Sequence, residues 1–123
     1  MKQVKIGGEK IDIQATPYSL VVHESEFGSD LIEDTMKLSA VMVSERVNGL
    51  LAMRITYTLA KTAALIKNSN QIFPEFNAWL MGIEALDLGN ADMYSEVIDE
   101  IQRKLFRSTE IKQEEEFKQS VEE

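Results

Sequence analysis

The chain has 123 residues, of which 44% are hydrophobic and 28% are charged, a balance typical of a single soluble globular domain. The absence of cysteine excludes a disulfide scaffold and a thiolate metal site, and it suits a reducing compartment. A net charge of −8 disfavours sequence-independent binding to a nucleic-acid backbone and favours partners with basic patches.

Residues 3–14 are predicted to form a β-hairpin. The expected register makes three pairs across the two strands: Val4 with Ile13, Lys5 with Asp12, and Ile6 with Ile11. One face is then aliphatic and the other carries an opposite-charge pair, while Gly8-Glu9 form a type II′ turn with Gly at its first central position. Because a two-stranded hairpin is at best marginally stable alone in water, its apolar face requires a cover. We expect the apolar helices within residues 31–66 to supply that cover.

Five helices are predicted after the hairpin, over residues 17–27, 30–48, 50–67, 74–86 and 91–107. The first begins at Thr16-Pro17, which suit the N-cap and the first helical position, and it ends at Gly28, a residue typical of the left-handed stop. The third helix is apolar on two faces and is therefore expected to be the buried, central one. The sequence thus predicts a mainly α (α+β) fold, with one compact domain over residues 1–107.

Two further expectations concern the ends of the domain and its surroundings. Residues 108–123 hold six Glu and two Lys, which predicts an acidic, flexible tail. The apolar stretch between Leu50 and Ile66 is interrupted by Arg54 and Lys61, so it is not expected to span a membrane. No secretory signal is recognisable at the N-terminus, and a cytoplasmic location is expected.

The chain offers few candidates for catalysis. Its single histidine, His23, has no cysteine partner and no clustered carboxylates, so we interpret it as a structural residue at the surface or half-buried. Two groups of carboxylates are interpreted as solvated helix faces: Asp30, Glu33 and Asp34, and Asp99 with Glu100. We expect no catalytic, cofactor-binding or metal-ligating residue and no enzymatic activity. An enzyme would require a concave pocket around His23 with perturbed carboxylates.

Binding residues are better represented, beginning with five methionines after the first residue: Met36, Met42, Met53, Met81 and Met93. Flexible, polarizable methionine is common where one surface accepts varied apolar segments, although it also fills gaps in cores. Met53 belongs to the buried helix, whereas Met36 and Met42 lie near the edge of the second helix and are predicted to be exposed and partner-binding. Phe117, in the acidic tail, is the third predicted partner-binding residue. Trp79 is expected to anchor the core.

Three segments together carry a family resemblance. They are the Val4–Ile13 hairpin, the helix that runs from Thr16-Pro17-Tyr18 to Glu26-Phe27-Gly28, and the later Trp79-Leu80-x-Gly82-Ile83-Glu84 segment. In this order and spacing, over residues 1–107, the chain resembles the small tail assembly chaperones of long-tailed bacteriophages and prophages.

The resemblance implies a non-enzymatic assembly factor in the cytoplasm of the bacterial host. Such a protein binds the tape measure protein, a long helical and aggregation-prone chain, keeps it soluble while tail tube subunits polymerise around it, and is absent from the mature virion. Self-association along the client is also implied, for which the open edge of the hairpin is the expected contact. No nucleic acid, membrane or cofactor is implied.

An alternative of another class is an acidic regulatory or inhibitor protein that binds a basic partner. Such a protein requires carboxylates spread along one exposed face. In this chain the acidic residues are concentrated at helix starts and in residues 108–123, which favours the chaperone interpretation.

Overall fold

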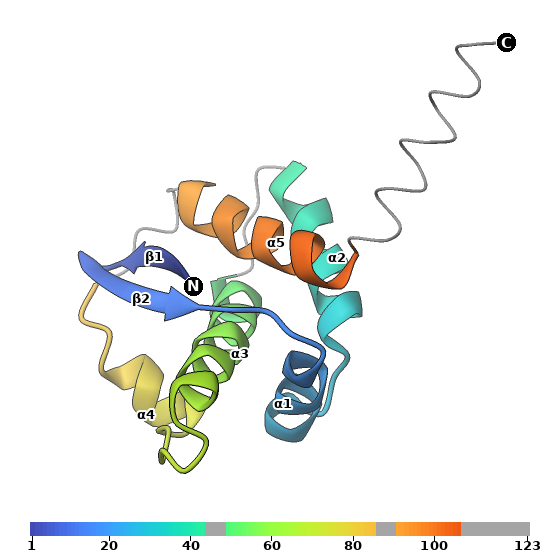
Figure 1. Ribbon diagram of the computed structural model, residues 1–123. Coiled ribbons are helices and arrows are strands. Elements are labelled where there is room, and N and C mark those ends of the chain that lie inside the picture. The colour runs from blue at the N-terminus through green and yellow to red at the C-terminus, as the bar shows by residue number, and fades with distance from the viewer. Residues whose placement is uncertain (44–48, 86–90, 107–123) are drawn as a thin grey trace, which may run out of the picture.

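A two-stranded antiparallel hairpin and five helices make up the part of the chain that the computed structural model describes, residues 1–43, 49–85 and 91–106 (Figure 1). The elements are β1 (Lys2–Ile6), β2 (Glu9–Ile13), α1 (Tyr18–Phe27), α2 (Leu31–Val43), α3 (Gly49–Lys67), α4 (Phe76–Met81) and α5 (Ala91–Leu105). This is the predicted fold class, an N-terminal hairpin followed by helices. The predicted helix residues 44–48, 86 and 107 and the predicted tail 108–123 lie outside the described residues.

The predicted hairpin register was wrong by two residues. The observed pairs are Lys2 with Ile13, Gln3 with Asp12, Val4 with Ile11, Lys5 with Lys10, and Ile6 with Glu9. The turn is Gly7-Gly8, in which both residues have positive φ (+59° and +87°), as a type I′ turn requires and as glycine alone adopts freely. Because side chains alternate with a period of two, a two-residue shift leaves each of them on its predicted face. The predicted pair of opposite charges is replaced by Lys5 opposite Lys10.

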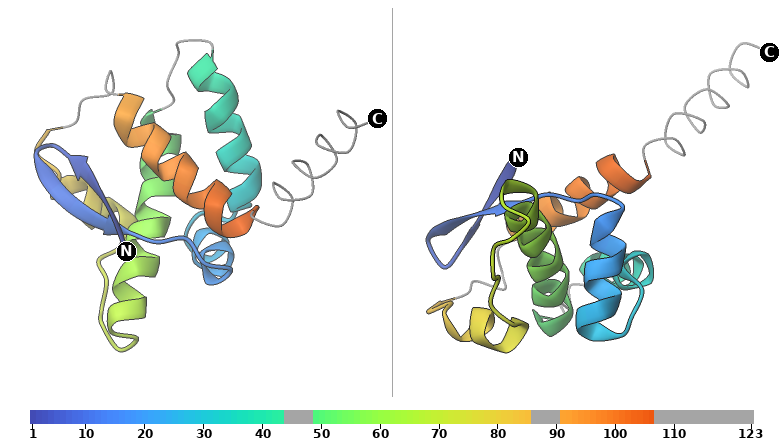
Figure 2. Two further views of the ribbon diagram at one scale, coloured as in Figure 1. Left: turned by 45° about the horizontal axis from the view of Figure 1, so that its top comes forward. Right: turned by 60° about the horizontal axis from the view of Figure 1, so that its bottom comes forward.

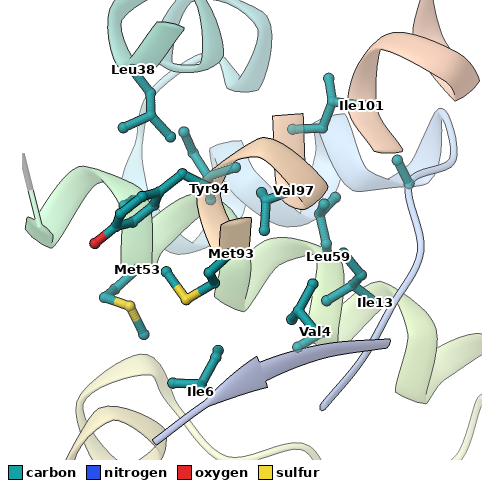
Figure 3. Packing of buried hydrophobic residues seen from close by; sticks show 14 of the residues in the cluster. Val4, Ile6, Ile13, Leu38, Met53, Leu59, Met93, Tyr94, Val97 and Ile101 are labelled. Carbon is teal, nitrogen blue, oxygen red and sulfur yellow. The ribbon is translucent and has the colours of Figure 1, made fainter. Parts of the chain in front are cut away.

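The apolar face of the hairpin is covered by α3 and α5. Val4, Ile6 and Ile13 are buried in one hydrophobic cluster with Leu59 of α3 and with side chains of α5, and Figure 3 shows Val4 and Ile13 facing this helical layer. The prediction that helices within residues 31–66 cover the hairpin is confirmed for α3, which packs on β2. The prediction did not include α5, which packs along β1. Lys2 reinforces this contact with ion pairs of 2.8 Å to Glu96 and 2.9 Å to Asp99, both on α5.

Helix α3 is the central element, as predicted. It contacts every other helix and also β2, and ten of its residues are buried, from Ala52 to Ala63. The backbone N–H of Gln14, just after β2, donates to the Leu59 carbonyl at 3.2 Å. Three buried threonines of α3 satisfy their hydroxyl groups by donating to the carbonyl four residues earlier: Thr56, Thr58 and Thr62.

Both ends of α1 follow their residue chemistry. The Thr16 hydroxyl accepts a hydrogen bond of 3.1 Å from the Tyr18 N–H, but the helix begins at Tyr18 with Pro17 in the cap position, one residue later than predicted. At the other end Gly28 has φ of +64°, and its N–H donates to the Glu24 carbonyl at 2.8 Å. The helix therefore ends at Phe27 in the left-handed turn that glycine allows.

Helix α4 is much shorter than the predicted helix over residues 74–86. Glu75 is extended, with φ of −63° and ψ of 158°, and the helix stops at Gly82, whose N–H is shared among three carbonyls of the last turn. Glycine is a weak helix former, so it ends the element here. The following Ala85 lies against the hairpin turn, where a Cβ on Gly7 would come within 2.2 Å of its carbonyl oxygen.

Candidate functional site

A buried polar cluster surrounds His23, the residue best equipped for chemistry in this chain. Its Nε2 atom lies 2.7 Å from Oδ2 of Asp34, and its Nδ1 atom lies 2.7 Å from Oγ1 of Thr58. Ser29 donates a hydrogen bond of 2.6 Å to the same Asp34 oxygen. The cluster therefore joins α1, α2 and α3 through one imidazole ring.

The structure corrects two predictions about this cluster. His23 has no exposed surface, although it was predicted to lie at the surface or half-buried, and Asp34 is buried, although it was interpreted as part of a solvated face. The sequence pattern missed both because an imidazole and a carboxylate can be buried when they satisfy each other. Burial by itself raises the pKa of Asp34, but the hydrogen bonds from His23 and Ser29 outweigh burial and hold the pKa below its usual value.

Thr58, His23 and Asp34 place a hydroxyl, an imidazole and a carboxylate in the same order as the catalytic groups of hydrolytic enzymes. The surroundings of these three groups differ from those of a hydrolytic site. Thr58 donates its hydroxyl proton to the Arg54 carbonyl at 3.0 Å, so its oxygen is engaged in the helix backbone. The His23 ring is enclosed, with Phe27 at a centroid distance of 5.1 Å. In this arrangement the cluster holds three helices together, and His23, Asp34 and Thr58 do not line the surface hollow described below.

Glu100 is a second carboxylate whose predicted exposure was wrong. Its side chain is buried, and Oε2 accepts a hydrogen bond of 2.8 Å from the Ala15 N–H. Asp99, beside it in the sequence, is exposed as predicted and pairs with Lys2. Within residues 1–43, 49–85 and 91–106, no three His, Asp or Glu side chains are arranged to hold a metal ion. No helix in these ranges is long and apolar enough to cross a membrane.

A surface hollow of about 470 Å³ lies where the end of α1, the start of α3 and α4 meet. Figure 2 (right) shows these three helices beside one another along one side of the molecule. The lining combines apolar, acidic and basic side chains: Glu26, Phe27, Leu50, Arg54, Glu75, Phe76, Asn77 and Leu80. Its size lies within the range of ligand and side-chain pockets.

Aromatic rings form the floor of this hollow. Phe27 meets Phe76 edge to face at a centroid distance of 5.0 Å, and Tyr57 packs beneath both at 5.9 and 5.4 Å. The Tyr57 hydroxyl donates to the Pro74 carbonyl at 2.6 Å. Burial, helped by the negative charges of Glu26 and Glu75, raises the pKa of Tyr57 to about 12. Tyr57 therefore supports the floor from below and ties it to the segment before α4.

Of the three predicted partner-binding residues, Met36 lies on α2 with 66% of its surface exposed. Phe117 and the side chain of Met42 lie outside what the structure describes. The other methionines divide as follows: Met53 and Met93 fill the core, whereas Met81 at the end of α4 is exposed. Trp79 packs edge to face on Tyr57 at 5.4 Å, half-buried against the core.

Sequence reasoning missed the hollow. Phe76 and Leu80, which line it, are only partly buried and pack against the core from α4. Leu50 and Arg54 are one turn apart and lie on the same face of α3. This spacing alone does not predict a hollow, because the hollow forms only where α4 packs beside that face. No protein family, curated protein or solved structure matches this chain.

Proposed function

We propose that this protein is a non-enzymatic tail assembly chaperone of a bacteriophage or prophage, which binds the tape measure protein and keeps it soluble while the tail tube assembles. It acts in the cytoplasm of the bacterial host and is absent from the finished virion. The observation that supports the proposal best is the hollow between α1, α3 and α4, because it offers an apolar, aromatic floor at the surface.

Client binding requires surface that a helical chain can cover. Recognition of an amphipathic helix by a groove uses apolar anchors set one turn apart. Leu50 is half exposed at the rim of the hollow, and Met81 and Ile72 extend exposed apolar surface around α4 and the loop before it. These features supply contact area for a long apolar client, in keeping with the proposal.

The test is co-expression with the tape measure protein of the same phage. We expect a larger fraction of the tape measure protein in the soluble extract, and co-purification through a tag on this chain. An acidic protein of similar size serves as control, because it separates specific binding from general solubilisation by charge. A tape measure protein that stays insoluble and does not co-purify would contradict the proposal.

Self-association is part of the same proposal. The hairpin has two strands of five residues each, and no third strand pairs with them among the described residues. Unpaired backbone groups at such an edge can accept a strand from a second copy, although charges such as Lys5 and Lys10 weaken that tendency. Light scattering after size-exclusion chromatography, with and without the client, measures the oligomeric state.

A further inference from the structure

We infer that the hollow between α1, α3 and α4 is the docking site for a basic amphipathic helix of the partner, with an apolar anchor inside the hollow and a Lys or Arg side chain at its rim. The inference rests on the binding function proposed above and specifies where the client binds and which chemistry it carries. Three observations support it: an apolar floor, a carboxylate without an ion-pair partner among the described residues, and an arginine in the lining.

The apolar floor selects the anchor. Phe27 and Phe76 present ring edges and faces at a centroid distance of 5.0 Å, and Leu80 continues this surface along α4. Leu50, with half of its surface exposed, forms the opposite wall on α3. An aliphatic or aromatic side chain entering here removes apolar surface of both molecules from water, which is the main favourable term in such association.

The rim selects the charge. Glu26 and Glu75 both line the hollow, but they differ in their partners. Glu26 forms an ion pair with Lys61 of α3, whereas Glu75 is exposed and has no ion-pair partner among the described residues. Glu75 is therefore available to a cation beside the apolar anchor, and opposite charges across an interface favour encounter and register.

Arg54 selects a hydrogen-bond acceptor. Its guanidinium carbon lies 5.5 Å from the centroid of the Phe27 ring, and its Nε atom is buried with no hydrogen-bond partner among the described residues. That atom is enclosed by the protein, but the Arg54 side chain also lines the hollow, where its positive charge favours the carbonyl end of a helix. The last turn of a helix has free carbonyl groups and commonly carries Lys or Arg, so one helix end satisfies both Arg54 and Glu75.

The acidic charge of this chain disfavours its own C-terminal segment, or a second copy of the chain, as the occupant of the hollow. Residues 108–123 carry six Glu against two Lys, so this segment would bring negative charge to the Glu75 rim. A second copy, with a net charge of −8, is a poorer match for the Glu75 rim than a basic chain, and the self-association proposed above uses the hairpin edge instead. A basic helix from another protein is the occupant that complements the site.

The experiment uses the full chain and two synthetic peptides of about five helical turns. Both have leucine along one face; the opposite face and the last turn carry lysine in one and glutamate in the other. Binding is followed by calorimetry and by the fluorescence of Trp79, which packs against Tyr57 and Phe76 beside the hollow. We expect the lysine peptide to bind at least about tenfold more tightly than the glutamate peptide, with an affinity that falls as salt is added.

Two matched pairs of variants locate the site. Leu50→Ser changes a residue that lines the hollow, and its control Ile66→Ser changes a residue of the same helix that is equally half exposed but does not line the hollow. Glu75→Gln changes the rim, and its control Glu84→Gln changes an exposed carboxylate that does not line the hollow. We expect Leu50→Ser to weaken binding of the lysine peptide about tenfold and Glu75→Gln about threefold, while both controls stay within about twofold.

The outcomes separate this inference from the proposed function. Equal binding of the two peptides, or equal effects of each variant and its control, would overturn the docking site. If the tape measure protein still co-purifies with Leu50→Ser and Glu75→Gln at the level of the unchanged chain, the chaperone function stands and the docking site is wrong. If the lysine peptide binds as expected but the tape measure protein does not, the docking site stands and the function is wrong.

Discussion

The imidazole Nε2 of His23 lies 2.7 Å from the Asp34 carboxylate. Both side chains are buried, so water does not compete for this contact. His23 belongs to α1 and Asp34 to α2, and the second ring nitrogen reaches Thr58 on α3. Three helices are therefore joined at one point, in addition to two polar contacts between α1 and α3, Ser19 with Thr62 and Glu26 with Lys61. Because a half-satisfied buried network is more costly than an apolar one, this point should control stability.

Replacing Asp34 with alanine should destabilise the fold. His23 and Ser29 both lose their acceptor, and leaving buried groups unsatisfied costs about 1–3 kcal/mol in the free energy of unfolding. Glu33→Ala is the matched control, because Glu33 is an exposed neighbour on the same helix that pairs with Lys37 across one turn, an interaction worth about 0.5 kcal/mol. Urea denaturation followed by circular dichroism measures both. Equal losses would contradict a special role for the buried cluster.

The same carboxylate predicts a dependence of stability on pH. Burial raises the pKa of Asp34, but hydrogen bonds from His23 and Ser29 outweigh it, and the folded-state pKa lies below the unfolded value of about 3.9. The stabilisation is therefore fully present above that value and is lost as pH falls through the folded-state pKa. We expect the stability difference between the unchanged chain and Asp34→Ala to shrink as pH falls below about 4. Denaturation curves between pH 2.5 and about 7 test this.

The elements of this fold were largely predictable because they depend on local signals. Thr16 and Gly28 mark the ends of α1 by backbone chemistry, and the two apolar faces of α3 indicate a central helix. The hairpin faces were also predictable, since they depend only on alternation. The register was not, because Gly7-Gly8 and Gly8-Glu9 are both acceptable turns and the same side chains face inward with either.

The candidate sites were less predictable because they depend on contacts between distant segments. His23 and Thr58 are 35 positions apart, and nothing in either neighbourhood indicates that they meet. The hollow likewise needs α1, α3 and α4 in place before Leu50, Arg54 and Glu75 share a surface. Patterns identify which residues can be buried or exposed, whereas tertiary packing decides which of them come together.

The hairpin turn offers a test that separates backbone strain from steric contact. Gly7 and Gly8 both have positive φ, but a Cβ on Gly7 would come within 2.2 Å of the Ala85 carbonyl oxygen, whereas a Cβ on Gly8 meets nothing within 4 Å. Gly8→Ala should therefore cost about 1–2 kcal/mol from the left-handed conformation alone. Gly7→Ala should cost about 1–3 kcal/mol more, because the hairpin and the segment after α4 must move apart. Equal unfolding free energies for the two variants would show that Ala85 does not pack against the turn.

Tyr57 should titrate later than an ordinary tyrosine. Burial beneath Phe27 and Phe76, together with Glu26 and Glu75, raises the pKa of its hydroxyl to about 12. Because the unfolded-state value is about 10, stability should be unaffected below pH 10 and should fall as pH rises from about 10 toward 12. Absorbance at the tyrosinate band during alkaline titration measures the transition, and Tyr57→Phe should remove the late component. A Tyr57→Phe curve that keeps this component would refute the assignment.

The client has two candidate binding surfaces, one around Met36 on α2 and one in the hollow that contains Leu50. Substitutions at these two residues distinguish between them. Met36, on α2, is the exposed residue that sequence patterns assign to partner binding, and it does not line the hollow that contains Leu50. Met36 is 66% exposed and Leu50 is 50% exposed. Replacing either of them with serine should therefore change the free energy of unfolding by no more than about 0.5 kcal/mol. We expect Leu50→Ser to weaken client binding about tenfold and Met36→Ser by less than about threefold, since Leu50 lines a hollow with an aromatic floor. Calorimetric titration of both variants with the same client gives the comparison. A larger loss for Met36→Ser would place the contact on α2.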